Sequence, residues 1–353
     1  MATLMDSRCE SRVWEEVLRR YPNEEEGEEG EGGSEWMMSF AMDDAEGIRD
    51  ALEIYGMAVV NLLTEEEADA TAEEALEDAS VRAAAVREHE TEPIRLDDPN
   101  TWKTSNWPRD QKFLFDAPAF TPCAFANRAK AYPVFRDLFG VDELWSSIDN
   151  WGVLRGTSGL SLVNPESGEV EEGVEKPEWR HSLAAHWDCN PYRVIEYERP
   201  QGLPQRYQGL VALTDCPVST GTFAIVPGSA AFLPTWVAEH PRKSKRSQAE
   251  PSRKSVRPKK TDPMVAHMQA IPLRKGQLVI FRQEALHANV PNTDANMRLV
   301  QFIRFMPASE YSCDVDKYAP PRVWAQYGGE RERVLEFVSS DQRPLFGLSD
   351  PDQ

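Results

Sequence analysis

The chain has 353 residues, 41% of them hydrophobic, so it can form one large domain with extensions or two domains around a sizeable core. Its net charge of -20 argues against nucleic acid as a partner, because most of the surface would repel phosphates. No apolar run reaches membrane-spanning length and the N-terminus lacks the apolar stretch of a signal peptide, so we expect a cytoplasmic protein without a membrane partner.

Residues 1–35 are predicted to be an extension outside the folded part. A short helix fits residues 10–20, and residues 23–34 place six Glu among glycines. Such an acidic run cannot bury apolar surface, so we interpret it as a disordered linker.

The first half of the folded part reads mainly as helices. A helix is predicted over 43–55, ended by Gly56 in a left-handed conformation, and a buried strand follows over 57–63. Thr64 and Glu67 have the spacing of a capping box that opens a long helix. The remaining expectations are a loop over 91–122, a helix over 124–139 and a strand over 144–155.

The second half has the sequence pattern of a β-structure. Short runs rich in Val, Ile and Phe alternate with Gly, Pro and Asp clusters, as in many-stranded sandwiches or barrels. The strands expected here cover SLAAHWD, YQGLVALTD, GTFAIVPGS, GQLVIF and RLVQFIRFMP. A helix is expected over 320–338 and frayed residues at the C-terminus.

A basic stretch interrupts this β-region. Residues 242–260 carry nine Lys or Arg and one Glu, a charge of +8, inside an insertion over 240–263. We interpret it first as a solvated loop. The alternative is a docking site for an acidic partner, a phosphate group or a nuclear import receptor.

The cysteines indicate a reducing compartment. They number five, are widely spaced and form no CxxC pair, so neither a disulfide framework nor a thiolate zinc site is expected. Cys189 is interpreted as buried and inert rather than as a nucleophile.

The triplet HWD is the first candidate for chemistry. On a strand, residues i and i+2 point to the same face, so His186 and Asp188 can reach one metal ion. A His-x-acid triplet is expected by chance in a chain this acidic, so on its own it equally describes an ordinary hydrogen-bonded histidine at a strand end.

Two later residues strengthen this hypothesis. His287 follows a strand through a short turn, and Arg298 begins the next strand. Two histidines and one carboxylate form the facial triad of non-haem Fe(II) oxygenases, which leaves open positions on the metal. The planar fork of Arg298 suits a carboxylate ligand, although alone it would read as an ion-paired strand residue.

The motifs of the chain, and the order in which they occur, resemble those of the phytanoyl-CoA dioxygenase (PhyH-like) family. The chain offers HWD, then LVALTD, a PGS turn, KGQLVIF, His287 and Arg298, and the resemblance covers roughly residues 45–307. It departs from the family pattern at Ala230, where relatives have a histidine that is not a metal ligand. It also departs at Gln208, which stands near the place of a tryptophan beside the co-substrate.

The resemblance implies a mainly β fold with flanking helices: a double-stranded β-helix (jelly roll, cupin-like) core in a domain over 36–320, followed by an extension over 321–353. It implies Fe(II) held by His186, Asp188 and His287, with Arg298 anchoring the distal carboxylate of 2-oxoglutarate and Gln208 contacting this co-substrate. With O2, such an enzyme hydroxylates a small organic or acyl substrate and releases succinate and CO2. The carboxylate of Asp188 favours hydroxylation over halogenation, which needs a small residue there.

Two other functions stay open on the sequence alone. One is a cupin-like metal-binding protein without oxidative turnover, and the other is an interaction protein with a relict site. Arg298 separates these from the oxygenase, because a bare metal site needs no carboxylate anchor.

Overall fold

The computed structural model describes residues 37–86, 91–107, 114–242, 256–309, 312, 314 and 316–348. The helix expected over 10–20, the acidic linker and most of the basic stretch 242–260 lie outside these residues. None of the helices in the described part of the chain is long and apolar enough to cross a membrane.

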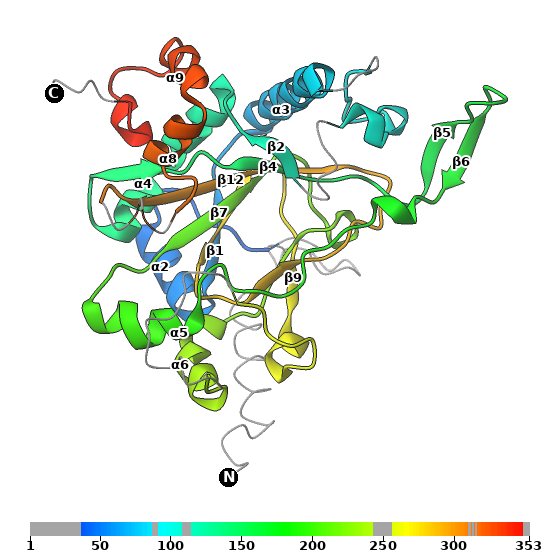
Figure 1. The fold of residues 1–353 in the computed structure, drawn as a ribbon. Coiled ribbons are helices and arrows are strands. Elements are labelled where there is room, and N and C mark those ends of the chain that lie inside the picture. Colours follow the sequence, from blue (N-terminus) through cyan, green and yellow to red (C-terminus); the bar gives the residue numbers. More distant parts are fainter. Residues whose placement is uncertain are drawn as a thin grey trace, which may run out of the picture.

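A large antiparallel sheet forms the body of the fold (Figure 1). Its strand order is β1-β10-β7-β12-β4-β2, with β3 pairing separately with β12. The strands are β1 (Met57–Asn61), β2 (Leu114–Pro118), β3 (Leu144–Ser146), β4 (Asn150–Leu154), β7 (Tyr207–Ala212), β10 (Gln277–Arg282) and β12 (Arg298–Pro307).

A smaller antiparallel sheet, in the order β11-β8-β9, faces the large one. It consists of β8 (Phe223–Ile225), β9 (Gln269–Ile271) and β11 (His287–Asn289). Phe223 packs against Phe281 of β10 with ring centroids 4.6 Å apart, and Phe281 lies 4.8 Å from the ring of His287. Side chains of the two sheets therefore meet across the interior, as in a sandwich. A separate hairpin of β5 (Leu160–Val163) and β6 (Val170–Val174) projects from the body (Figure 1).

The longest strand, β12, has two different faces. On one, Gln301 donates a hydrogen bond to the carbonyl of Ala124 at 2.8 Å, and Phe305 packs on Phe135, so this face is covered by helix α4. On the other, Phe302 and Arg304 line a cavity between the sheets. Because side chains alternate along a strand, β12 separates the helical layer from the interior where a ligand can enter.

The predicted helices of the first half are confirmed. Gly56 has a φ of 79° just past α2, and beyond β1 the capping box closes reciprocally. The Thr64 N–H donates to Glu67 at 2.8 Å, and the Glu67 N–H donates to the Thr64 hydroxyl at 3.2 Å. These helices are α2 (Ala45–Ile54), α3 (Glu65–Val86) and α4 (Pro122–Phe139).

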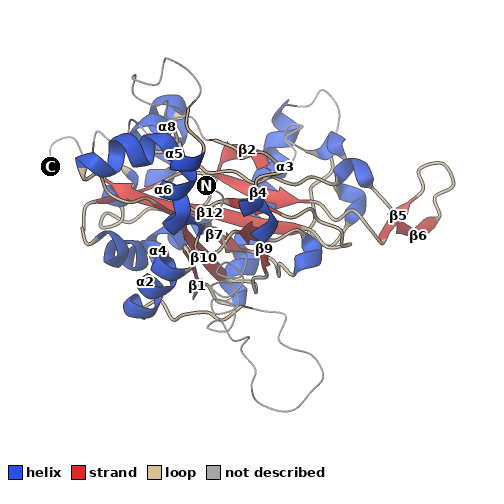
Figure 2. Ribbon diagram, turned by 90° about the horizontal axis from the view of Figure 1, so that it is seen from below, coloured by secondary structure: helices blue, strands red, loops and turns tan. Residues whose placement is uncertain are grey.

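Figure 2 shows the strands at the centre with helices around them. The later helices are α5 (Pro191–Arg193), α6 (Ser229–Glu239), α8 (Pro320–Gln326) and α9 (Gly328–Leu335). Single turns are formed by η1 (Pro99–Thr101), η2 (Thr104–Asn106), η3 (Pro177–Trp179), η4 (Val194–Glu198, a π-helix), η5 (Arg199–Gln201), η6 (Val218–Thr220), η8 (Pro263–His267) and η9 (Arg343–Phe346).

Four local predictions were wrong. The segment SLAAHWD is not a regular strand, because only His186 and Trp187 pair, each through an isolated bridge. The helix expected over 320–338 is divided at Tyr327, and the strand expected over 144–155 is broken after Ser146. The C-terminal residues were expected to be frayed, but the chain is ordered up to residue 348, where Phe346 is fully buried.

Candidate metal centre

Three side chains form a compact cluster of metal-ligand type. His186, Asp188 and His287 each offer one ligand atom, and these atoms lie within 4.8 Å of one another. The Nε2 atoms of His186 and His287 lie 3.3 and 3.5 Å from the two carboxylate oxygens of Asp188. The three residues that the sequence marked as iron ligands are thus brought together from segments one hundred residues apart.

The two histidines are aligned by their own backbones. The His186 N–H donates to the carbonyl of His287 at 2.9 Å, and the His287 N–H donates back at 3.1 Å. Both side chains are buried, with 7% and 5% of their surface exposed. This bridge fixes one imidazole relative to the other even though HWD is not part of a longer strand.

The orientation of each ring leaves the same nitrogen for a metal. Nδ1 of His186 lies 3.0 Å from the carbonyl of Ala184, and Nδ1 of His287 lies 3.0 Å from that of Ala285. A carbonyl accepts but cannot donate, so Nδ1 carries a hydrogen, and in the neutral imidazole Nε2 keeps the lone pair that a metal needs. Both Nε2 atoms face Asp188, which gives the donor set that suits Fe(II).

The carboxylate of Asp188 is held in its charged form. Burial by itself raises its pKa, but hydrogen bonds and positive charge from the protonated imidazoles of His186 and His287 hold the pKa well below its usual value. Gln208 on β7 donates a further hydrogen bond to Asp188 at 2.7 Å. Gln208 therefore contacts the acidic member of the cluster, while its expected contact with 2-oxoglutarate stays a prediction.

Arg298 lies apart from the cluster. It is 2% exposed at the start of β12, and its Nε and Nη2 atoms are buried with no hydrogen-bond partner among the described residues. Burial lowers the pKa of its guanidinium, and the neighbouring Cys216 acts in the opposite direction. A buried cation with two unpaired N–H groups is costly, and an anion would offset that cost.

A cavity of about 550 Å³ opens beside the cluster. It touches all three candidate ligands and Gln208 but not Arg298, which sits farther along the same face of β12 as Phe302 and Arg304. Its apolar lining consists of Leu183, Leu210, Phe223, Phe281 and Phe302, and its polar lining includes Asn150, Arg304, Lys317, Tyr318 and Arg322.

Arg304 is the main cavity residue that sequence analysis missed. Its guanidinium pairs with Asp149 at 3.0 Å and with Asp316 at 3.1 Å, so it is buried as part of an ion cluster. Although burial lowers its pKa, the two carboxylates raise it overall. The signal was present, because Arg304 is six residues after Arg298 and alternation puts both on one face of the strand.

Trp187 and Cys189 take structural positions beside the cluster. Trp187 is fully buried, and its ring packs 4.6 Å from that of Trp236, so it points away from the metal ligands as a packing residue. Cys189 is also buried, and burial raises the pKa of its thiol, which agrees with the inert cysteine expected.

Comparison with known proteins gives a consistent result. The family model described as "Phytanoyl-CoA dioxygenase (PhyH)" matches residues 180–300, the region that holds HWD, His287 and Arg298. The chain is 24% identical over 296 residues to a Dictyostelium discoideum protein named "Putative phytanoyl-CoA dioxygenase", covering 73% of this chain and 74% of that protein.

A solved structure supports the fold. The "Putative Oxidoreductase" of Salmonella typhimurium LT2 superposes with a TM-score of 0.54 at 14% identity, over 87% of this chain and 79% of that one. The expected mainly β fold with a jelly-roll core and flanking helices is confirmed. The family match over residues 180–300 and the curated relative make the chain similar to the phytanoyl-CoA dioxygenase family of non-haem Fe(II)- and 2-oxoglutarate-dependent oxygenases.

Proposed function

We propose that the protein hydroxylates a small organic or acyl substrate, with O2 as oxidant and conversion of 2-oxoglutarate to succinate and CO2. The observation that carries this proposal is the cluster of His186, Asp188 and His287 in the lining of a cavity of about 550 Å³. That size lies within the range of small-molecule sites, and the mixed apolar and polar lining suits an organic substrate.

The proposed metal ligands are Nε2 of His186, Nε2 of His287 and a carboxylate oxygen of Asp188. When bound there, Fe(II) supplies the O2-dependent oxidation that side chains alone cannot perform. The chain contributes alignment: backbone carbonyls hold each Nδ1–H, and the Gln208 amide holds Asp188. Such outer hydrogen bonds orient ligands and tune their affinity.

Arg298 is proposed to pair with the distal carboxylate of 2-oxoglutarate. Its two unpartnered N–H groups match the two oxygens of a carboxylate, and its burial keeps competing water away. The proposal places the co-substrate deep between the sheets. The substrate then occupies the part of the cavity lined by Phe281, Phe302 and Arg304, nearer the rim.

The test is a spectrum recorded without oxygen. Fe(II) and then 2-oxoglutarate are added to metal-free wild type, His186→Ala, Arg298→Ala and, as a control, Arg136→Ala, whose half-exposed side chain lies on α4. A weak visible charge-transfer band is expected in wild type and Arg136→Ala, but not in His186→Ala.

For Arg298→Ala the band should need roughly 10- to 100-fold more 2-oxoglutarate, because a charge-assisted hydrogen bond contributes about 1.5–3 kcal/mol. Absence of the band in folded wild type would remove the oxygenase proposal. Equal 2-oxoglutarate requirements in wild type and Arg298→Ala would remove only the role of Arg298.

A further inference from the structure

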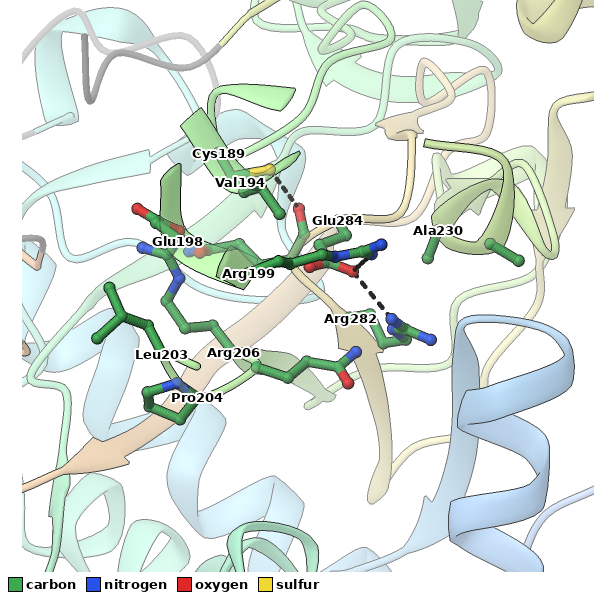
Figure 3. A pocket seen from close by; sticks show the side chains of 13 residues that line it. Cys189, Val194, Glu198, Arg199, Leu203, Pro204, Arg206, Ala230, Arg282 and Glu284 are labelled. Atoms are coloured by element: carbon green, nitrogen blue, oxygen red, sulfur yellow. Dashed lines mark hydrogen bonds and ion pairs between the residues drawn. The ribbon is translucent and has the colours of Figure 1, made fainter. Parts of the chain in front are cut away.

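A second cavity, of about 310 Å³, lies beside the candidate metal centre and is lined by none of its three ligands. Its walls come from the segment 189–206, which contains η4 and η5, from the end of β10 with the residues that follow it, and from the start of α6 (Figure 3). Cys189 directly follows Asp188, and Gln283 lines both this cavity and the larger one. We call it the charged cavity, since ionised side chains form much of its wall.

One carboxylate of the charged cavity is shared by two guanidinium groups. Arg199 and Arg282 both donate to the same oxygen of Glu284, at 2.8 and 2.9 Å. Figure 3 shows the two arginine side chains converging on Glu284. One negative charge here faces two positive charges.

The other carboxylate repeats this arrangement. Arg193 donates to one oxygen of Glu198 at 2.7 Å, and Arg206 donates to the other. Glu198 is only 7% exposed and ends the π-helix η4, an irregularity that is common at functional sites. Of the charged side chains that line the cavity, three are arginines (Arg199, Arg206 and Arg282) and two are glutamates (Glu198 and Glu284), so the lining has one positive charge more than it has negative charges.

Donor and acceptor groups remain available in the cavity. Among the described residues, the Arg199 side chain bonds only to Glu284, although a guanidinium has five N–H donors. Gln283 is 7% exposed, and its Oε1 atom is buried with no partner in the described part of the chain. The Arg199 side chain is 39% exposed, so a small ion can enter from solvent.

The remaining wall is apolar. Val194, Leu203, Pro204 and Ala230 contribute apolar lining around the ion pairs. We propose that the charged cavity is a binding site for a small anion that carries a phosphate or carboxylate group. The anion pairs with Arg199 and Arg282, since guanidinium forks bind both groups in a bidentate manner. This site is independent of iron chemistry.

Calorimetric titration of the full chain with inorganic phosphate at low ionic strength tests the site. We expect one phosphate per wild-type chain, with binding weakened at least ten-fold in Arg199→Gln and in Arg282→Gln. Arg136→Gln is the matched control, because its side chain is 43% exposed, is paired with a neighbouring carboxylate and lies on α4. It should bind as wild type does.

A folding defect is separated from a binding defect by Arg199→Lys, which keeps the charge and should retain part of the affinity. No binding by wild type, or equal weakening in Arg199→Gln and Arg136→Gln, would overturn the proposal. Ethyl phosphate distinguishes the two sources of the anion. Tighter binding than inorganic phosphate indicates an organic ligand whose body fills the apolar wall, and equal binding indicates free phosphate.

Discussion

At the scale of single residues, hydrogen bonds to the ligands matter as much as the ligands themselves. Gln208 holds Asp188 at 2.7 Å, on the carboxylate oxygen that also faces His287. Without this bond, Asp188 is held less firmly, since its side chain is 38% exposed. In the proposed metal site, binding of the ion would then have to order this acidic ligand.

We therefore expect Gln208→Leu to bind Fe(II) about 10- to 100-fold more weakly than wild type, the usual effect of losing an outer-shell partner. Anaerobic metal titration followed by tryptophan fluorescence measures this change. Gln326→Leu, an exposed change on α8, serves as the control. Unchanged Fe(II) affinity in Gln208→Leu would show that Asp188 is positioned without this amide.

The cysteines give a second prediction at this scale. Burial raises the pKa of the Cys189 and Cys216 thiols and raises that of half-buried Cys123 to about 11. A raised pKa keeps the reactive thiolate scarce at pH 8. In native protein, iodoacetamide should modify Cys123 before Cys189 or Cys216, and mass spectrometry locates the label. Early labelling of Cys189 would contradict its burial and would support the alternative that Cys189 is a reactive nucleophile.

At the scale of elements, turns set the register that brings ligands together. Gly276 leads into β10 with a φ of 88°, and a Cβ there would lie 2.4 Å from the carbonyl oxygen of Leu63. Its own N–H donates to the carbonyl of Ala212 at 2.8 Å. This turn joins β1, β7 and β10, so its backbone conformation has to be one that only glycine adopts cheaply.

Gly276→Ala should lower the free energy of unfolding by about 1–3 kcal/mol, the usual cost of a strained backbone position. Gly329→Ala is the control, because it lies in the first turns of α9, where an added Cβ meets nothing within 4 Å. Urea unfolding followed by circular dichroism compares the two. A loss in Gly276→Ala no larger than in the control would mean that the turn relaxes freely.

At the scale of the whole molecule, the C-terminal region is part of the fold. Trp324, Val334 and Phe346 form an apolar cluster with Phe120 and Phe125 from the region of α4. The Trp324 indole also donates to the carbonyl of Phe346 at 2.7 Å. The boundary expected at residue 320 thus separates segments that share a core, so we propose that the catalytic domain needs this extension for stability.

Phe346→Ala should destabilise the protein by about 3–5 kcal/mol, because it removes a fully buried aromatic side chain and leaves a cavity. Val170→Ala on the projecting hairpin, where the side chain is 60% exposed, should change stability by less than about 0.5 kcal/mol. Thermal unfolding measures both changes. Equal melting temperatures for the two variants would show that the C-terminal cluster is dispensable.

The sequence by itself determined the local features and the candidate ligands. The helix ends at Gly56, the capping box of Thr64 and Glu67, and strands such as β12 follow from residue type and spacing over a few positions. The order of HWD, His287 and Arg298 pointed to the metal chemistry for the same reason, since each motif is local.

Only the tertiary structure decided what surrounds those residues. The bridge between His186 and His287, the bond from Gln208 to Asp188 and the cluster of Arg304 with Asp149 join segments that are distant in the chain. The irregular pairing of HWD has the same origin, because His186 pairs with His287 of β11 and Trp187 pairs with Val256 in a different segment. Contacts of this kind depend on how strands and loops pack, and no short-range pattern in the sequence encodes them.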